Sequence, residues 1–380
     1  MKIKQFKPFL GDEEYLSIKE CFDSNWITEG PKSKEFCDKL LELTGAKYGV
    51  FANNGTLSLY LGLKALGIQD GDEVLVPNFT FIASANAVIM AGGKPIFVDV
   101  NKDTMHIDLE QCRKLITPKT KAIMPVHIYG TAADMESIME FANKFKLLVI
   151  EDAAQAIGVN WNGQHCGTFG HVGSFSFFAD KTITTGEGGF LVTNDEKIYE
   201  NLLYLRNQGR INRGSFIHPE IGFNFRITDI QAAIGLVQLK KLNLIIEKKK
   251  NILQLYKKHL EGVRGIRIFE PPNLSDHVPF RVAIMFEKKA KEVMKFFESK
   301  EIETRTFFYP LHKQPCFTEV MMSQYCDVCV ETFGINCKMS CFENSQELYD
   351  HGVCVPSYPE LSEEEVRYIC DQIRELTNEE

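Results

Sequence analysis

The first half of the chain alternates short apolar runs with stretches of helical periodicity. This alternation is typical of a mostly parallel sheet whose strands are joined by covering helices. Because only a loop separates the last two predicted strands, one of them is expected to run antiparallel to the rest. Strands are predicted at 48–53, 73–78, 94–100, 121–129, 147–152, 172–178 and 188–194, with helices such as 56–66 and 134–145 between them.

A long amphipathic helix is predicted to start at Thr228, where Gln231 completes a capping box. Its lysine patch, 248–250, is expected on the solvent side. We interpret this helix as the connector between a large domain, residues 1–245, and a smaller α+β domain, residues 246–380. In the smaller domain we expect a strand at 280–285 and helices at 290–299 and 363–377, the last capped by Ser362.

Composition narrows the class of protein. The 380 residues are 44% hydrophobic and 25% charged, as in ordinary globular proteins. No apolar run approaches the ~18 residues of a membrane helix, and the first residues lack the apolar core of a secretory signal, so a cytoplasmic protein is expected. The net charge of -8 disfavours a general nucleic-acid binder, which needs a basic face.

Eleven cysteines are present, and several of them gather in one stretch of the predicted small domain. The spacing of Cys326, Cys329, Cys337 and Cys341 allows a structural zinc site, although the gap between the two pairs is shorter than usual. The alternative, which we prefer, is a set of reduced cysteines without metal, in an insertion near 317–348.

Three motifs carry candidate chemistry. Residues 53–57 (NNGTL) join a strand to a helix start, which suits a phosphate or a simple tight turn. Residues 149–155 (VIEDAAQ) deliver an acid to the carboxyl edge of the sheet, either as a ligand group or as a helix cap. Residues 174–189 place Lys181 before a glycine-rich turn, where it is a desolvated nucleophile or merely a solvated charge. The G-x-G-x-x-G and P-loop signatures are absent.

Together the motifs supply the three parts that a pyridoxal 5'-phosphate (PLP) enzyme needs: a phosphate cup, a carboxylate and a later lysine. The chain resembles the DegT/DnrJ/EryC1/StrS family of PLP-dependent nucleotide-sugar aminotransferases. That resemblance implies an α/β fold of the aspartate aminotransferase type (fold type I), with a seven-stranded mostly parallel sheet and a smaller α+β domain. The matching segments are 26–31, 55–56, 76–81, 97–100, 151–155, 174–189 and 222–226.

The resemblance implies roles for individual residues. Lys181 would bind the cofactor covalently and move the proton during catalysis. Asp152 would keep the pyridine nitrogen protonated, Gln155 would bind the ring hydroxyl, and Phe81 would stack on the ring.

It also implies a shared site. The cofactor phosphate would be held by Gly55, Thr56, Leu57 and Ser176, and by Asn224 from the other subunit. A homodimer is therefore expected.

The substrate expectation also follows from the resemblance. The chain is similar to the perosamine synthase branch of the family, which aminates C4 of a GDP-linked 4-keto-6-deoxy sugar with L-glutamate as donor, for surface polysaccharides. Arg226, Arg305, Tyr309 and His312 are the candidate substrate contacts. Alternatives are a dTDP- or UDP-linked 4-keto sugar, a 3-keto sugar, or an inactive scaffold of the same fold. The dehydratase relatives carry histidine in place of the lysine, and Lys181 argues against them.

Overall fold

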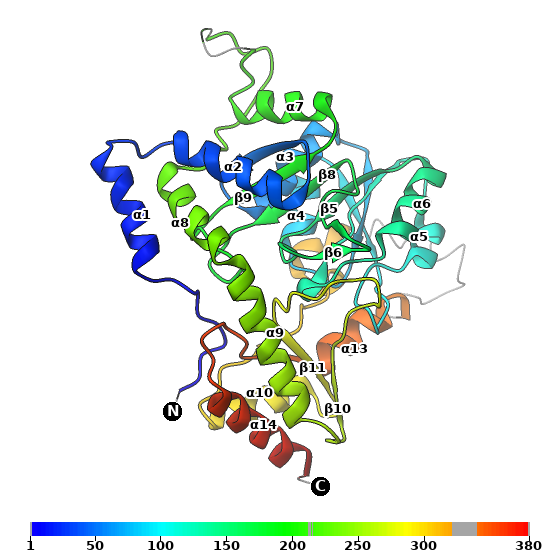
Figure 1. Cartoon of the computed structure of the whole chain (residues 1–380). Coiled ribbons are helices and arrows are strands. Elements are labelled where there is room, and N and C mark those ends of the chain that lie inside the picture. The colour runs from blue at the N-terminus through cyan, green and yellow to red at the C-terminus, as the bar shows by residue number, and fades with distance from the viewer. Residues whose placement is uncertain (1, 212–213, 215, 321–339, 379–380) are drawn as a thin grey trace.

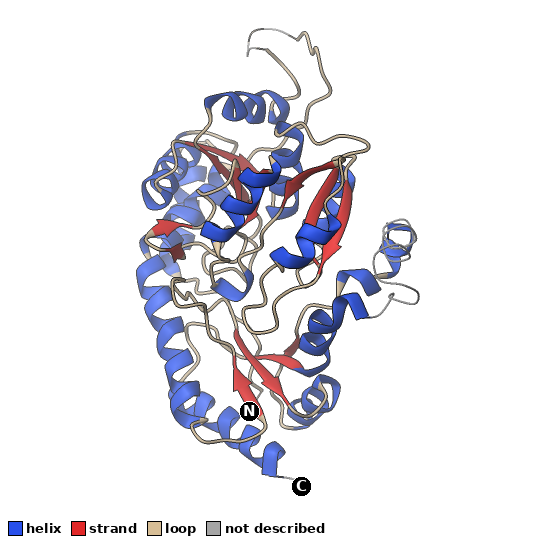
Figure 2. Cartoon of the chain, turned by 90° about the vertical axis from the view of Figure 1, so that its right-hand side faces the viewer, coloured by secondary structure: helices blue, strands red, loops and turns tan. Residues whose placement is uncertain are grey.

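The computed structural model describes residues 2–211, 214, 216–320 and 340–378 (Figure 1). A large α/β part carries a seven-stranded sheet, and a smaller part with its own sheet lies below it in both views (Figure 2). The helix α9 (Leu242–His259) runs from one part into the other (Figure 1). The boundary that we place after residue 245 therefore stays a prediction that falls within this helix.

The large sheet has the strand order β1-β9-β8-β5-β4-β2-β3. β9 runs antiparallel to both of its neighbours, β1 and β8, and the other pairs in this sheet are parallel, which confirms the expected reversal. The third and fourth predicted strands end earlier than expected. The strands are β1 (Tyr48–Ala52), β2 (Glu73–Pro77), β3 (Lys94–Val98), β4 (Thr120–Ile123), β5 (Leu148–Asp152), β8 (Val172–Ser176) and β9 (Gly189–Thr193).

Both faces of this sheet are buried, which explains its nearly continuous apolar strands. Successive residues alternate between two cores: Phe51 and Leu75 belong to one, and Val50 and Val74 to the other. The first core is covered by α2 (Pro31–Thr44), α5 (Leu109–Leu115), α6 (Met135–Phe145) and α8 (Asp229–Lys240). The second is covered by α3 (Gly55–Ala65), α4 (Ala83–Met90) and α7 (Glu196–Arg206). Outside these layers lie α1 (Asp12–Asp23), which packs on α8, the short turn η1 (Ile128–Gly130) and a hairpin of β6 (Asn160–Trp161) and β7 (Gln164–His165).

The predicted connector helix is divided at Lys241. Its start is as expected, because the Thr228 side chain accepts from the N–H of Gln231 in a capping box. At Lys241 the backbone N–H is shared between the carbonyls of Val237 and Gln238, and the side chain pairs with Glu14 of α1. The single helix predicted here is therefore two helices, α8 and α9.

The small sheet is antiparallel throughout, in the order β10-β11-β13-β12. Its strands are β10 (Ile266–Ile268), β11 (Val282–Phe286), β12 (Arg305–Thr306) and β13 (Gly352–Val355). The helices α10 (Ala290–Ser299), α13 (Glu343–His351) and α14 (Glu363–Asn378) contact it or α9, and the short turns η2 (Leu311–Lys313), η3 (Pro315–Phe317) and η4 (Ser340–Phe342) lie between β12 and α13. Ser362 caps α14 as expected, since its hydroxyl accepts from the N–H of Glu365.

The N-terminal segment links the two parts. Ile3 bridges to Ile302 next to the small sheet, and the carbonyl of Phe9 accepts from Gln238 of α8. Residues 5–9 between these anchors line a pocket at the base of the loop that follows β8. The pattern of hydrophobic and polar residues did not predict that residues 3–9 pass from one part to the other.

The cysteine-rich stretch lies largely outside the described residues, as do Cys326, Cys329 and Cys337 of the predicted zinc site. Cys341 is described, in η4, and its carbonyl accepts from Gln111 of α5. Within the described ranges no group of three or more His, Cys, Asp or Glu side chains is placed to hold a metal ion. In the same part of the chain, no helix combines the length and apolar character needed to cross a membrane.

Candidate active site

The candidate residues gather where the parallel strands end. Asp152 ends β5 and Ser176 ends β8, while Asn53 follows β1 and Asn78 follows β2. Since the carboxyl ends of parallel strands meet at one edge of a sheet, side chains from distant parts of the sequence converge there.

The turn after β1 packs closely against the end of β8. Asn54 caps α3, accepting from the N–H of Leu57 at 3.0 Å, so this N–H already has a partner. A Cβ on Gly55 would lie 2.8 Å from the Ser176 Cβ, so only glycine fits here. The start of α3 and the Ser176 hydroxyl are thus neighbours, and a helix start beside a hydroxyl suits an anion.

Asp152 is buried, with 6% of its surface exposed. Its carboxylate accepts from the Ser84 hydroxyl at 2.7 Å and from the N–H of Ala154 at 3.2 Å. Burial raises its pKa, and the hydrogen bonds together with the charge of Lys181 act in the opposite direction. A carboxylate in this state is stabilised by a cationic partner such as a protonated ring nitrogen.

Three aromatic side chains, Tyr129, Phe308 and Phe81, contact one another in series near Gln155. The buried Gln155 accepts from the N–H of Tyr129 at 2.8 Å. The Tyr129 ring stacks on Phe308 with centroids 5.5 Å apart, and Phe308 contacts Phe81 edge-on at 6.4 Å. Phe81 itself is 57% exposed, so its ring has a face available to a ligand.

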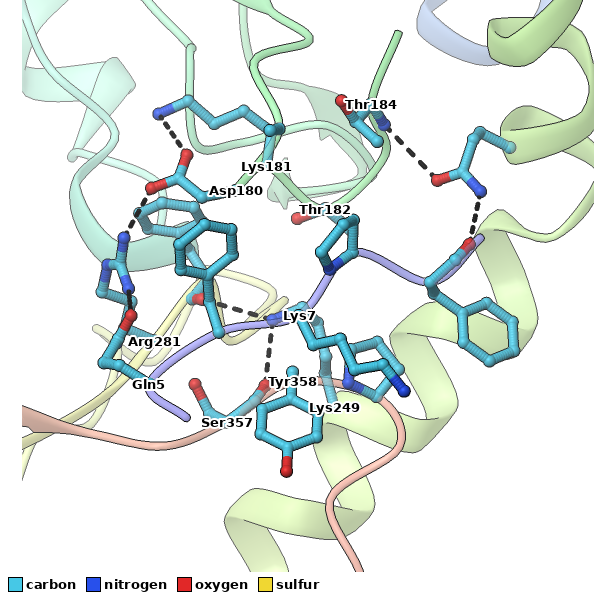
Figure 3. A pocket seen from close by; sticks show the side chains of 17 residues that line it. Gln5, Lys7, Asp180, Lys181, Thr182, Thr184, Lys249, Arg281, Ser357 and Tyr358 are labelled. Carbon is cyan, nitrogen blue, oxygen red and sulfur yellow. Dashed lines mark hydrogen bonds and ion pairs between the residues drawn. The ribbon is translucent and has the colours of Figure 1, made fainter. Parts of the chain in front are cut away.

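Lys181 follows β8 in a loop, and its side chain is only 15% exposed. Its Nζ lies 4.0 Å from Asp180 Oδ1 and 4.7 Å from the centre of the Phe280 ring (Figure 3). Burial lowers the pKa of Lys181, while Asp180 and Asp152 raise it and Arg281 lowers it further; the net change is downward. A lysine with a lowered pKa has more of the neutral amine that attacks a carbonyl.

Asp180 and Arg281 form a buried ion pair that sequence reasoning missed. Arg281 donates to Asp180 Oδ2 at 2.6 Å and also donates to Gln5 (Figure 3). A signal was available: Arg281 interrupts the apolar run 278–286, and a charge in a buried strand needs a partner.

Lys249 corrects another expectation. The patch 248–250 was predicted on the solvent side, but Lys249 is 6% exposed. Its Nζ donates to the carbonyls of Pro279, Phe280 and Ser357 at 3.1–3.2 Å. These carbonyls precede β11 and follow β13, so α9 is fastened to the small sheet through one ammonium group.

Three of the predicted substrate contacts lie in β12 and in the segment that follows it. Arg305, in β12, has its Nη1 4.0 Å from Asp180 Oδ2, and half of its side chain is exposed. Tyr309 is 39% exposed and packs against Tyr349. His312 stacks on Phe342 and accepts from the Asn78 amide at 2.9 Å, and burial lowers the pKa of His312 to about 4. The neutral ring of His312 thus ties this segment to the end of β2.

Asn224 and Arg226 lie in the segment that precedes α8. Arg226 Nε donates to Asn224 Oδ1 at 2.8 Å, and the Arg226 carbonyl accepts from the Asn53 amide at 3.1 Å. This places the backbone of Arg226 beside the turn after β1, while Asn224 is exposed. No contact joins either side chain to Lys181 within the described chain.

The residues present fit PLP. The close contact of Gly55 with Ser176 places a helix start beside a hydroxyl, which are donors that suit a phosphate, and Asp152 has the burial that a ring nitrogen partner needs. Lys181 is a shielded amine on the same edge, and Phe81 offers an open aromatic face.

Comparison with known proteins decides the family. A model of the DegT/DnrJ/EryC1/StrS aminotransferase family matches residues 8–374. The chain belongs to this family. The match confirms the sequence-based assignment, and it spans the cysteine-rich stretch near 317–348.

Individual members of the family are similar over nearly their full length. The chain is 39% identical to a GDP-perosamine synthase of Escherichia coli O157:H7, covering 98% of each protein. It is 34% identical to a UDP-N-acetyl-3-dehydro-alpha-D-glucosamine 3-aminotransferase of Acidithiobacillus ferrooxidans, covering 96% of this chain and 94% of that one. The PLP form of the sugar aminotransferase Spr1654 from Streptococcus pneumoniae superposes with a TM-score of 0.90 at 25% identity, covering 99% of each chain. These findings confirm the predicted fold type and a PLP-dependent sugar aminotransferase.

Proposed function

We propose that this aminotransferase moves an amino group from L-glutamate to C4 of a GDP-linked 4-keto-6-deoxy sugar. The observation that carries the proposal is the 39% identity to a GDP-perosamine synthase over 98% of both chains. The intact set of cofactor residues at the carboxyl edge of the sheet supports turnover rather than a scaffold role.

Each candidate residue has a task in this proposal. Gly55, Thr56 and Ser176 hold the cofactor phosphate, with Leu57 held by its cap at the same helix start. Asp152 keeps a proton on the ring nitrogen. Lys181 anchors the cofactor and then accepts and returns the proton at the reacting carbon.

The orientation of the ring is assigned to two further residues. Gln155 binds the ring hydroxyl, and Phe81 packs on the ring face. When bound, PLP supplies an electron-accepting ring that stabilises negative charge at the carbon carrying the amino nitrogen. The protein contributes orientation, shielding from water and the placement of protons.

Substrate binding is assigned to β12, to the segment that follows it and to Arg226 before α8. Arg305 is half exposed beside the Lys181 pocket, and its planar fork suits the oxygens of a diphosphate or carboxylate. We assign Tyr309, His312 and Arg226 to the sugar nucleotide as well. His312 acts as a neutral group, since its pKa is lowered to about 4.

A homodimer completes the proposal, with Asn224 of the partner subunit reaching the phosphate. The segment before α8 exposes large apolar side chains: Ile211 is 70%, Phe216 87% and Ile221 88% exposed. Apolar groups gathered in this way are typical of a surface that a second chain covers.

The similarity to a 3-aminotransferase favours a second candidate, amination at C3 of a keto sugar. A panel of GDP-, dTDP- and UDP-linked 3-keto and 4-keto sugars, each offered with glutamate, distinguishes the two. We expect a 4-amino product from the GDP-linked 4-keto-6-deoxy sugar, identified by mass and NMR. A product aminated only at C3, or turnover confined to another nucleotide, contradicts the proposal.

The inactive-scaffold alternative has a simpler test. An enzyme with PLP on Lys181 is yellow, bleaches with borohydride, and then carries the label on Lys181. A colourless protein that cannot be reconstituted with PLP contradicts catalysis of any kind through this cofactor.

A further inference from the structure

The two oxygens of Asp180 have different surroundings. Oδ2 accepts from Arg281 at 2.6 Å and lies 4.0 Å from Arg305. Oδ1 is buried, has no hydrogen-bond partner in the described part of the chain, and lies 4.0 Å from Lys181 Nζ. An unpaired carboxylate oxygen is costly inside a protein unless a nearby charge offsets it, and the closest ionic partner of Oδ1 is the Lys181 ammonium.

Arg281 is fixed from several sides, so the orientation of Asp180 is fixed with it. Its guanidinium also donates to Gln5, which the N-terminal segment brings to the pocket. The backbone just before it is held by Lys249 through the carbonyls of Pro279 and Phe280. Figure 3 shows Arg281 pointing to the Asp180 carboxylate, Gln5 of the N-terminal segment bonded to Arg281, and Lys249 of α9 bonded to backbone oxygens nearby.

We propose that Asp180, locked by Arg281, is a positioning residue for Lys181: it holds the lysine nitrogen in its buried place whenever that nitrogen is not bound to the cofactor. Amino transfer frees this nitrogen and requires it to take up and return a proton, so a fixed counter-charge favours one location for the protonated amine. The inference rests on the proposed role of Lys181.

The charges that face Lys181 predict the direction in which its pKa should shift when one of them is removed. Asp180 and Asp152 favour the protonated amine, while Arg281 and burial disfavour it. Removing the Asp180 charge leaves Arg281 unopposed, so the lysine loses its proton at lower pH. Removing the Arg281 charge has the opposite effect.

The test labels lysines in the full-length, PLP-free protein with acetic anhydride across a pH series and quantifies acetylated Lys181 by peptide mass spectrometry. In Asp180→Asn, the pH of half-maximal labelling is expected to fall by about one unit. In Arg281→Gln it is expected to rise. Opposite shifts distinguish positioning from a merely structural role, because general loosening of the loop would move both variants the same way.

Two controls accompany the test. Asp103→Asn removes a carboxylate that pairs with Arg267 at the surface, and it should leave the Lys181 midpoint unchanged. The exposed Lys291 serves as an internal reference in every sample. If Asp180→Asn does not fold, Arg281→Gln alone tests the inference: a rise in the pH of half-maximal Lys181 labelling supports it, and a fall or no change overturns it.

An unchanged Lys181 midpoint in folded Asp180→Asn, or shifts of one sign in both variants, would overturn the inference. Since no turnover is measured, the result is independent of the substrate panel. If the substrate panel contradicts the proposed reaction, the labelling result still holds. If the labelling test contradicts the role of Asp180, the proposed reaction is unaffected.

Discussion

At the scale of single residues, the site depends on how burial changes ordinary side chains. Lys181, Asp152 and His312 are common residue types, and the structure makes each of them unusual by removing water. The three motifs taken together, with the family resemblance, selected Lys181 and Asp152 as candidates: Asp152 ends one predicted strand, and Lys181 follows another. Asp180 and Gln5 could not be selected, since their significance comes only from contacts with Arg281 across the fold.

The first residue-scale prediction concerns the proposed catalytic base. Lys181→Ala removes both the covalent anchor and the group that moves the proton, so turnover should fall by at least about a thousandfold. The yellow colour of the loaded protein should be lost while its circular dichroism spectrum persists. Lys291→Ala, at an exposed position on α10, is the matched control. Activity close to that of the unchanged chain would disprove the assignment.

The second concerns His106, which is buried and contacts Thr131. Burial lowers its pKa to about 3, with His127 adding to the effect, whereas an unfolded histidine titrates near 6.5. Between these values the unfolded chain binds a proton that the folded chain does not, so stability falls as the pH falls. The loss from this residue is about 1.4 kcal/mol per pH unit below about pH 6.5.

Urea unfolding at several pH values measures this loss. His106→Gln should show a shallower decline of the unfolding free energy between about pH 6 and about pH 4.5, even if its stability at neutral pH is lower. His218→Gln, at an exposed position, should keep the original slope. If the unfolding free energy depends on pH equally in His106→Gln and in the unchanged chain, His106 is not a neutral buried group.

At the scale of elements, periodicity predicted the strands and helices well and their exact ends less well. The fourth strand was predicted to 129, but β4 ends at Ile123. The Met124 N–H still bonds to Leu75 of β2, but Pro125 has no N–H to continue the ladder, and the chain then turns towards η1. Lys249 was misplaced because a lysine on a helix is normally solvated. Only the carbonyls of distant segments make a buried position possible for it.

A prediction at this scale concerns the start of α14. Ser362→Ala removes the hydroxyl that accepts from the N–H of Glu365, and it should lower the free energy of unfolding by about 1 kcal/mol. Ser362→Asp keeps an acceptor and should lie within about 0.5 kcal/mol of the unchanged chain. Denaturant unfolding checks both variants, with the same dependence of the unfolding free energy on denaturant concentration used for all three proteins. A full loss in the aspartate variant would show that the cap is not the cause.

At the scale of the whole molecule, the parts of the site come from both sheets, the N-terminal segment and, by our proposal, a second chain. Sequence reasoning predicted the fold, which the comparisons confirm, and it proposed cofactor residues that lie close to strand ends; their roles stay a prediction. It could not obtain the crossing of residues 3–9 or the joint between α9 and the small sheet. Both depend on packing between segments far apart in the sequence.

Shared sites predict complementation. Lys181→Ala and Asn224→Ala homodimers should each be impaired, the first completely. After mixing and subunit exchange, activity should reappear, because one site of each mixed dimer then has both Lys181 and Asn224 of the partner subunit intact. Two Lys181→Ala preparations carrying different tags are the control. Continued inactivity of verified mixed dimers would contradict a phosphate contact across the interface.

The three carbonyls around Lys249 form a cage of the kind that proteins also use to bind a potassium ion. Burial lowers the pKa of Lys249 to about 7, so below that pH the cation in the cage is part of the chain and cannot exchange with the medium or be removed by dialysis. The joint between α9 and the small sheet is therefore independent of which alkali metal surrounds the enzyme. Replacing potassium by sodium or tetramethylammonium at equal ionic strength should leave its thermal midpoint unchanged.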